Sequence, residues 1–452
     1  MRHQQIISRP AYPAARLIVI SAVTVAAAAA LLAFAPSVGA ASDWTTPHGF
    51  ATGKGVDIVP RAGVAADGTS AVAWKTAKGT LVVSIGRRQG PFGPPRVVDR
   101  AGASDWSVAA APGGAFLIAW EDSDAIRVAV RIRSGRPVIV RRVTTSTGSG
   151  INGLQAARDP RGGWVIAERQ FPRKGRGEYR VRALSLDAAG RLIGPVKEFG
   201  PGQFGIDARP TQALAVDPDG RAVFTFTREA PALGEAGTVL VSTRPHGGVF
   251  GEPVAVPGPA AGPRVVVGDR GRAVIAVARA GSCAEAGCFG PPGVALLAAG
   301  GAPGSPFGPS IARPGRAFAP TAALTADGGG VLVFQLKTKP SPFSTEAPVR
   351  AVAFAADGSV GPLQTLTPAL AVEPVVLPLS GGRVLALWAG TRRLGAALAG
   401  PNGRFHKAAA PGGAPPEPGH GNATNRDLRT AGRYAIFAWE DNGLVRISVR
   451  RF

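Results

Sequence analysis

The sequence predicts an all-β protein, a single β-propeller that most simply has eight four-stranded blades. Two observations support this prediction. A unit of apolar strand, Gly-containing turn and second apolar strand occurs eight times, and Gly and Pro number 62 and 41 among 452 residues, as expected for many tight turns. Four antiparallel strands in about fifty residues make one blade. Seven blades are the alternative, if one unit is a hairpin within a loop.

The first two strands of each unit are predicted from the turn between them, as in "GVAADGTSAVAW" or "ALAVDPDGRAVFTF". Alanine is common in the first strand, which fits a crowded position next to the propeller axis. The second strand is bulkier and often ends in an aromatic residue. The eight second strands end at Trp74, Trp120, Glu168, Phe226, Val277, Phe334, Trp388 and Trp439.

The third strand is predicted from period-two alternation, as in "IRVAVRIR" and "LVRISVRR". A fourth segment follows a return such as "GPFGPPRVV" or "GVFGEPVAV". On these motifs the chain resembles exported bacterial β-propellers whose units read "lAvDpdGravvaW" before a G-x-F-G-x-P return. The resemblance implies a fold and no particular activity, because propellers carry enzymes and binding modules alike.

The two ends of the chain suggest how the ring closes. The last unit ends at Phe452 after its third strand, while "SDWTTPHGF" at residues 42–50 stands before the first unit and resembles a fourth strand. We therefore expect a closing strand at about residues 42–50 to complete the last blade, with the repeat units at about 56–452. Pairing the ends would remove an exposed sheet edge. A disordered N-terminus is the alternative.

Residues 1–40 have the layout of an export signal. Three arginines precede the apolar run "LIVISAVTVAAAAALLAFA", and small residues follow at "SVGA". We expect cleavage near Ala40, leaving a propeller domain at 41–452 that is secreted and not inserted in a membrane. An uncleaved membrane anchor is the alternative. The predicted signal holds three arginines and no acid, so the formal net charge falls from +22 by three to +19.

Two cysteines, Cys283 and Cys288, lie in "GSCAEAGC". In an exported chain this close pair predicts a disulfide bond. A metal pair is the alternative, but a structural zinc site needs four ligands and no histidine is near. We expect no metal and no cofactor.

The face around the propeller axis that carries the second-to-third and fourth-to-first connections is the predicted binding face. The second-to-third connections of units 3 to 6 are long, and long loops in compact domains are often functional. Paired carboxylates there would suit acid–base catalysis, although solvated acids after strands are common. The candidate residues at this mouth are Trp106, Glu121, Asp122, Asn152, Asp207, Arg209, Glu440 and Asp441.

Arginines on the third strands predict a basic sector, which either protects sheet edges or binds anions. Its members are Arg127, Arg131, Arg133, Arg180, Arg182, Arg446 and Arg450, with Arg87 and Arg88 beside them. We therefore expect a monomeric, non-enzymatic recognition or scaffold module for an anionic polysaccharide, a cell-wall polymer or a protein. Nucleic acid is not expected, because no aromatic residues interleave the arginines. A divergent glycoside hydrolase or polysaccharide lyase acting at the mouth is the alternative.

Overall fold

The structure is a computed structural model in which residues 43–452 form one compact unit. It describes residues 44–52, 59–100, 102–122, 125–133, 138–145, 149–171, 179–202, 212–228, 237–268, 271–279, 282–284, 287–298, 301–309, 316–325, 327–337, 347–390, 394–408, 410, 426–441 and 443–451. The predicted signal at residues 1–40 lies outside them. Among the described residues, no helix is long and apolar enough to span a membrane.

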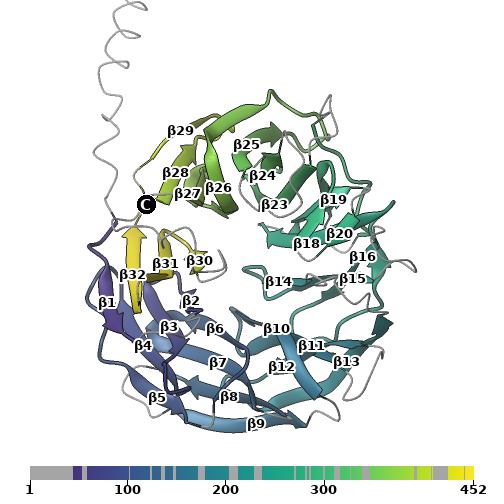
Figure 1. Ribbon diagram of the computed structural model, residues 1–452. Helices are drawn as coiled ribbons and strands as arrows, with labels where there is room; N and C mark the ends of the chain where they lie inside the picture. Colours follow the sequence, from purple (N-terminus) through teal and green to yellow (C-terminus); the bar gives the residue numbers. More distant parts are fainter. Residues whose placement is uncertain are drawn as a thin grey trace, which may run out of the picture. The chain divides into compact units, whose positions relative to one another are not determined.

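Eight antiparallel blades follow one another around a common axis (Figure 1), with blades 6 and 7 joined in one continuous sheet, which confirms the predicted all-β propeller with eight blades. The strands of the first four blades are given from the axis outwards. Blade 1 has β2 (Arg61–Val64), β3 (Thr69–Lys75), β4 (Leu81–Arg87) and β5 (Arg96–Asp99), and blade 2 has β6 (Trp106–Ala111), β7 (Ala115–Asp122), β8 (Ala125–Arg131) and β9 (Ile139–Thr145). Blade 3 has β10 (Ser149–Arg158), β11 (Trp164–Phe171), β12 (Tyr179–Leu186) and β13 (Leu192–Gly202), and blade 4 has β14 (Gln212–Val216), β15 (Ala222–Arg228), β16 (Thr238–Arg244) and β17 (Val254–Ala255).

The later blades are less regular. Blade 5 has β18 (Ala260–Val267), β19 (Ala273–Arg279) and β22 (Pro292–Leu297). The described part of its fourth segment pairs with β22 through isolated bridges at Phe307 and Pro303. Blade 6 has β23 (Arg316–Leu324), β24 (Gly330–Lys337) and β25 (Ala347–Phe354). The long strand β26 (Gln364–Pro378) is the outer strand of blade 6 and then the inner strand of blade 7. Blade 7 continues with β27 (Val384–Gly390), β28 (Leu394–Ala399) and β29 (Phe405–Lys407).

The N-terminal segment supplies the outer strand of blade 8. Here β30 (Arg426–Ala431), β31 (Tyr434–Asp441) and β32 (Leu444–Arg451) are followed in the sheet by β1 (His48–Ala51), which pairs antiparallel with β32. Thr45 extends the pairing: its amide N donates to the carbonyl O of Val449 at 2.9 Å, and its hydroxyl accepts the Val449 amide at 2.9 Å. This is the blade and the strand that the sequence indicated for residues 42–50.

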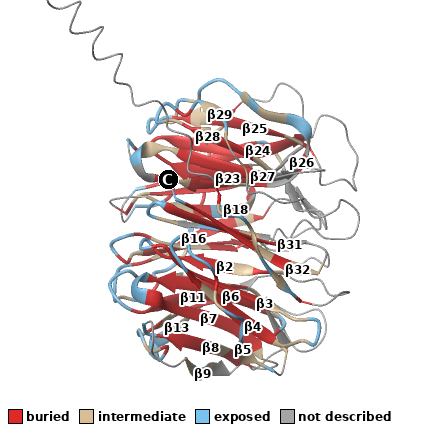
Figure 2. Cartoon of the chain, turned by 90° about the vertical axis from the view of Figure 1, so that its left-hand side faces the viewer, coloured by how far each residue is buried: buried red, intermediate tan, exposed pale blue. Residues whose placement is uncertain are grey.

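The core lies between the blades. Strand side chains alternate between the two faces of a sheet, and eight hydrophobic clusters each join one blade to the next, including blade 8 to blade 1. Figure 2 shows buried residues along the strands and exposed residues mainly at their ends. Trp74, Trp120, Trp164 and Trp439 are among the largest fully buried side chains. The aromatic residues that mark the repeat therefore fill the seams between blades.

The contribution of the N-terminal strand to stability is a prediction. Deleting residues 43–52 removes β1 and the buried Trp44, which packs between blades 7 and 8, and exposes the edge of β32. We expect a loss of at least about 3 kcal/mol in the free energy of unfolding, the value typical of removing one large buried side chain, together with self-association through the new edge. Thermal unfolding and light scattering measure both. A chain beginning at residue 41 is the control, and equal stability of the two chains would contradict the prediction.

Candidate functional sites

Two faces of the ring follow from the strand order. The first-to-second and third-to-fourth connections of every blade lie on one face, here called the turn face. The second-to-third and fourth-to-first connections lie on the other, the loop face. Neighbouring turns touch on the turn face: the Gly113 amide of blade 2 donates to Asp67 Oδ2 of blade 1 at 2.7 Å. The predicted binding face is the loop face.

The residues predicted at the mouth do not form one site among the described residues. Trp106 is buried, and its Nε1 donates to the Ala73 carbonyl at 3.3 Å, as expected for a packing residue. Asp122 forms an ion pair with Arg127. Glu440 Oε1 accepts the Gly443 amide at 2.9 Å in the turn after β31. Glu121 alone belongs to a buried polar cluster.

Four other predicted positions give less information. Asn152 pairs with Arg169 in the β10–β11 ladder, and Asp441 pairs with Leu444 in the β31–β32 ladder, so only their backbone positions are described. Asp207 and Arg209 lie outside the described residues, as do most of the long second-to-third connections of blades 3, 4 and 6.

Three carboxylates and one arginine lie between blades 2 and 3 near the loop face. Asp105 and Glu121 are neighbours across two strands, because the Glu121 amide donates to the Asp105 carbonyl at 3.0 Å. Ser104, which is exposed, donates its hydroxyl to Glu121 Oε2. Glu121 lies on the same face of β7 as Leu117 and Ala119, which pack against blade 3. We call Asp105, Glu121, Glu168 and Arg182 the acidic seam.

Glu168 enters the acidic seam from blade 3. It continues the face of β11 on which Trp164 and Ile166 pack against blade 2. Its side chain is fully buried and forms an ion pair with Arg182, its partner in the β11–β12 ladder. Burial raises the pKa of Glu168 to about 7; Arg182 opposes this rise, and the charges of Glu121 and Glu198 add to it. Glu168 therefore holds a proton up to nearly neutral pH.

Burial also raises the pKa of Asp105, although bonds from the Leu154 and Trp106 amides and the charge of Arg61 oppose the shift. The Leu154 amide of blade 3 donates to Asp105 Oδ2 at 2.8 Å, so this carboxylate also ties two inner strands together. Perturbed carboxylates of this kind occur both at catalytic sites and in structural ion-pair networks. The arrangement can store and exchange a proton.

Sequence reasoning missed Asp105 and Glu168 as site residues. A signal for Glu168 was present, because it ends a second strand where six of the other seven units end in an aromatic residue, which the structure shows to be buried. The structure places Glu168 and Trp120 on matching strand faces, each directed at the preceding blade. Asp105 gave no such signal, since an acid before a strand is ordinary.

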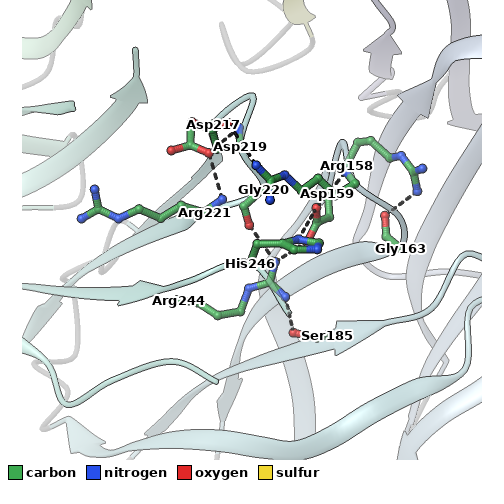
Figure 3. Close-up of polar contacts among 11 residues, drawn as sticks. Arg158, Asp159, Gly163, Ser185, Asp217, Asp219, Gly220, Arg221, Arg244 and His246 are labelled. Carbon is green, nitrogen blue, oxygen red and sulfur yellow. Dashed lines mark hydrogen bonds and ion pairs between the residues drawn. The ribbon is translucent and has the colours of Figure 1, made fainter. Parts of the chain in front are cut away.

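A second buried polar cluster joins blades 3 and 4 at the turn face (Figure 3). Arg244 is 3% exposed, and its guanidinium donates to Asp159 Oδ2 at 2.6 Å, to Ser185 Oγ at 2.9 Å and to the Gly220 carbonyl at 3.2 Å. His246 Nδ1 lies 3.2 Å from Asp159 Oδ1. Gly220 has a φ of +80°, and a Cβ there would lie 2.5 Å from Asp159 Oδ1. The cluster is closely fitted, which is typical of a structural contact between blades.

The predicted basic sector divides into buried and accessible arginines. Arg131, Arg182 and Arg450 are 8%, 7% and 1% exposed, so these three side chains are buried, contrary to the expectation for a shared surface sector. Arg180 is exposed and lies 3.6 Å from Glu198. Arg446, on β32, is half-buried.

Six exposed arginines lie on the outer strands of blades 1 and 2 or just beyond the ends of these strands. We call this set the basic wall; it consists of Arg87, Arg88, Arg96, Arg100, Arg133 and Arg142. Arg87, Arg96 and Arg142 lie on β4, β5 and β9, and the other three lie just beyond strand ends. The strands β4, β5, β8 and β9 together carry a single acidic residue, Asp99. Asp99 Oδ2 accepts a hydrogen bond from Trp120 Nε1 at 3.0 Å, so this acid links blade 1 to blade 2. The basic wall therefore has a strong excess of positive charge.

The two cysteines lie opposite each other in a small hairpin. Strands β20 (Ser282–Ala284) and β21 (Gly287–Phe289) pair with Cys283 facing Cys288, and Phe289 pairs with Phe318 of β23, the inner strand of blade 6. Directly opposed strand residues have Cα atoms about 4.5–5.5 Å apart, a spacing that a disulfide can bridge. The disulfide stays a prediction. Thiol titration of the unfolded, unreduced protein should find no free thiol, whereas two free thiols would contradict it.

The described residues contain no group of three or more His, Cys, Asp or Glu side chains placed to hold a metal ion. No family model matches the chain, and no curated protein sequence matches it. Solved structures match in fold. The polysaccharide lyase Uly1 is 12% identical, with a TM-score of 0.51 over 90% of this chain and 92% of its own. An α-L-arabinanase of Penicillium chrysogenum is 11% identical, with a TM-score of 0.41 over 91% and 97%. A Dyadobacter fermentans protein of unknown function is 12% identical, with a TM-score of 0.42 over 66% and 94%.

Proposed function

We propose that the protein is an exported, non-enzymatic recognition module that binds an anionic polymer, such as an acidic polysaccharide or a cell-wall polymer, on the basic wall. The single observation that supports this most is the excess of arginine on β4, β5, β8 and β9, whose one acid, Asp99, accepts a hydrogen bond from Trp120 Nε1. Closely spaced guanidinium groups attract polyanions over several ångströms and steer their association. Binding of this kind weakens as salt screens the charges.

Affinity for dextran sulfate, with neutral dextran as the uncharged reference, tests the proposal. Replacing Arg88, Arg100 and Arg133 by Glu reverses three exposed charges of the basic wall, and we expect at least about tenfold weaker binding at low salt. The control replaces Arg228, Arg404 and Lys407 by Glu, which changes the net charge equally on blades 4 and 7. Equal losses in both variants, or binding that is independent of salt, would refute the role of the basic wall.

A second candidate function is the cleavage of a glycan at the loop face, and the acidic seam favours it. Glycosidases pair a carboxylic acid that stays protonated with a second, ionised carboxylate. The acidic seam holds one carboxyl whose pKa burial raises, that of Glu168, and a second carboxyl, that of Glu121, which acts on it electrostatically. The test is release of reducing ends or unsaturated sugars from neutral and acidic polysaccharides. Activity that disappears in both Glu121→Gln and Glu168→Gln, with the fold retained, would replace the first proposal. Activity retained by both variants would exclude the acidic seam as its source.

A further inference from the structure

We propose that the seam between blades 1 and 2, at the turn face, holds a binding site for one sulfate or phosphate group, formed by Arg87, Arg96 and Arg131. This inference rests on the proposed function, because the group would belong to the anionic polymer on the basic wall. It goes further in naming one site and the charged group that the site takes.

Arg131 occupies the same place in blade 2 that Arg244 occupies in blade 4. Arg131 is paired with Phe116, the second residue after the turn glycine Gly114, and Arg244 is paired with the second residue after Gly220. Each guanidinium donates to the carbonyl of that glycine, at 2.7 Å from Arg131 Nε and at 3.2 Å from Arg244 Nη2. Both side chains are buried. The fold thus builds the same buried cation twice.

Of these two buried arginines, Arg244 has a carboxylate of the neighbouring blade as its ion-pair partner, and Arg131, among the described residues, does not. Asp159, the first residue of the blade 3 turn, neutralises Arg244 across the seam. The corresponding turn residue of blade 1 is Ala65. The two turns match in their hydrogen bonds: the Gly68 amide donates to the Ala65 carbonyl at 2.8 Å, and the Gly162 amide donates to the Asp159 carbonyl at 3.0 Å. Ala65 is 3% exposed and provides no charge for Arg131.

Two further arginines take the place of that acid. Arg87 continues the face of β4 on which Leu81 and Val83 pack against blade 2. Arg96 is two residues before Val98, which packs into the same seam from β5. Arg131 shares a strand face with Ala129, which packs against blade 1. All three arginines are therefore directed at one seam.

The electrostatics agree with this convergence. Burial lowers the pKa of Arg131, and the charges of Arg96 and Arg87 lower it further, so Arg131 lies close enough to each of these two arginines to be repelled by it. Among the described carboxylates, none forms an ion pair with Arg96 or Arg131. Arg131 is held in place by Gly114 and by the Phe116 ring, whose centroid lies 4.9 Å from its Cζ. A fixed guanidinium beside two exposed ones suits an oxyanion, which would accept charge-assisted bonds and relieve the repulsion.

Titration with sodium sulfate and with sodium phosphate, against sodium chloride at equal ionic strength, tests the site by calorimetry and thermal unfolding. We expect saturable binding that chloride does not reproduce, and the tighter of the two anions identifies the group. The double variant Arg87→Ala/Arg96→Ala should bind about tenfold more weakly, the loss expected for one charge-assisted interaction. The double variant Arg228→Ala/Arg404→Ala, with the same net charge, should bind as the wild type does.

Ala65→Asp tests the comparison with blade 3 directly. An aspartate there would give Arg131 the partner that Asp159 gives Arg244, so we expect saturable anion binding to disappear while the melting temperature at low salt rises. Anion binding that persists in Ala65→Asp, or equal binding by both double variants, would overturn the site. Dextran sulfate binding separates the two proposals. If the wild type binds dextran sulfate and shows no saturable binding of the small anions, the site is wrong and the basic wall stands. If dextran sulfate does not bind, the proposed function is wrong.

Discussion

Replacing Arg244 by alanine is expected to lower the free energy of unfolding by about 3–5 kcal/mol, the usual effect of breaking a buried ion pair from one side. The reason is the charge left behind. Asp159 is 3% exposed, and without Arg244 its partners would be His246 and the turn amide of Arg161. Denaturant unfolding followed by tryptophan fluorescence measures the change.

The control is Arg404→Ala, which removes an exposed arginine and should change stability by no more than about 0.5 kcal/mol. A double-mutant cycle adds a sharper test. Asp159→Ala combined with Arg244→Ala should cost clearly less than the sum of the two single changes, because the second removes the charge that the first leaves unpaired. Additive single changes, or a cost below about 1 kcal/mol for Arg244→Ala, would show that this cluster does not join blades 3 and 4.

The second large effect is a loss of stability as the pH rises, caused by Glu168. Its pKa is 4.5 for an unperturbed group and about 7 in the fold. Between these values the folded state keeps the proton and the unfolded state releases it, so the contribution of Glu168 is full below pH 4.5 and is lost as the pH rises to about 7. The shift corresponds to a loss of about 3 kcal/mol over this range.

Glu168→Gln isolates this effect, because glutamine resembles the protonated acid and does not titrate. From pH 4.5 to pH 7.5, the wild type should lose about 3 kcal/mol of unfolding free energy relative to Glu168→Gln. Glu121→Gln removes a negative charge near Glu168, which lowers the pKa of Glu168. In this variant the loss of stability should therefore occur at a lower pH than in the wild type. A difference that is constant with pH would mean that Glu168 is ionised throughout, held by Arg182.

The fold could be predicted from the sequence because its strongest constraints are local. A tight turn between two apolar strands, repeated eight times, needs no knowledge of distant contacts. The pairing of β1 with β32 could also be anticipated, since the last unit lacked a strand that residues 42–50 could supply. The continuity of β26 could not, because the sequence assigns its two halves to separate repeat units, the first half to the outer strand of blade 6 and the second half to the inner strand of blade 7.

The polar clusters were harder to predict, because each depends on two blades. Alternation along β8 correctly placed Arg127 and Arg131 on one face, but it did not reveal that Arg131 is buried against blade 1 while Arg127 pairs with Asp122. Glu168 and Glu121 belong to units about fifty residues apart in sequence, and only the register of both blades brings them together. That Ala65 stands where blade 3 has the acid Asp159 can be recognised only when the turns of blades 1 and 3 are compared in the structure.

Hydrogen–deuterium exchange with and without dextran sulfate is the most direct test of the central claim that the basic wall binds anionic polymers. We expect slower exchange in β4, β5, β8 and β9 and in the turns at Arg88 and Arg133, and unchanged exchange at the loop face. Protection confined to the segments around Asp105 and Glu121, with the basic wall unchanged, would contradict it and place the binding site at the acidic seam.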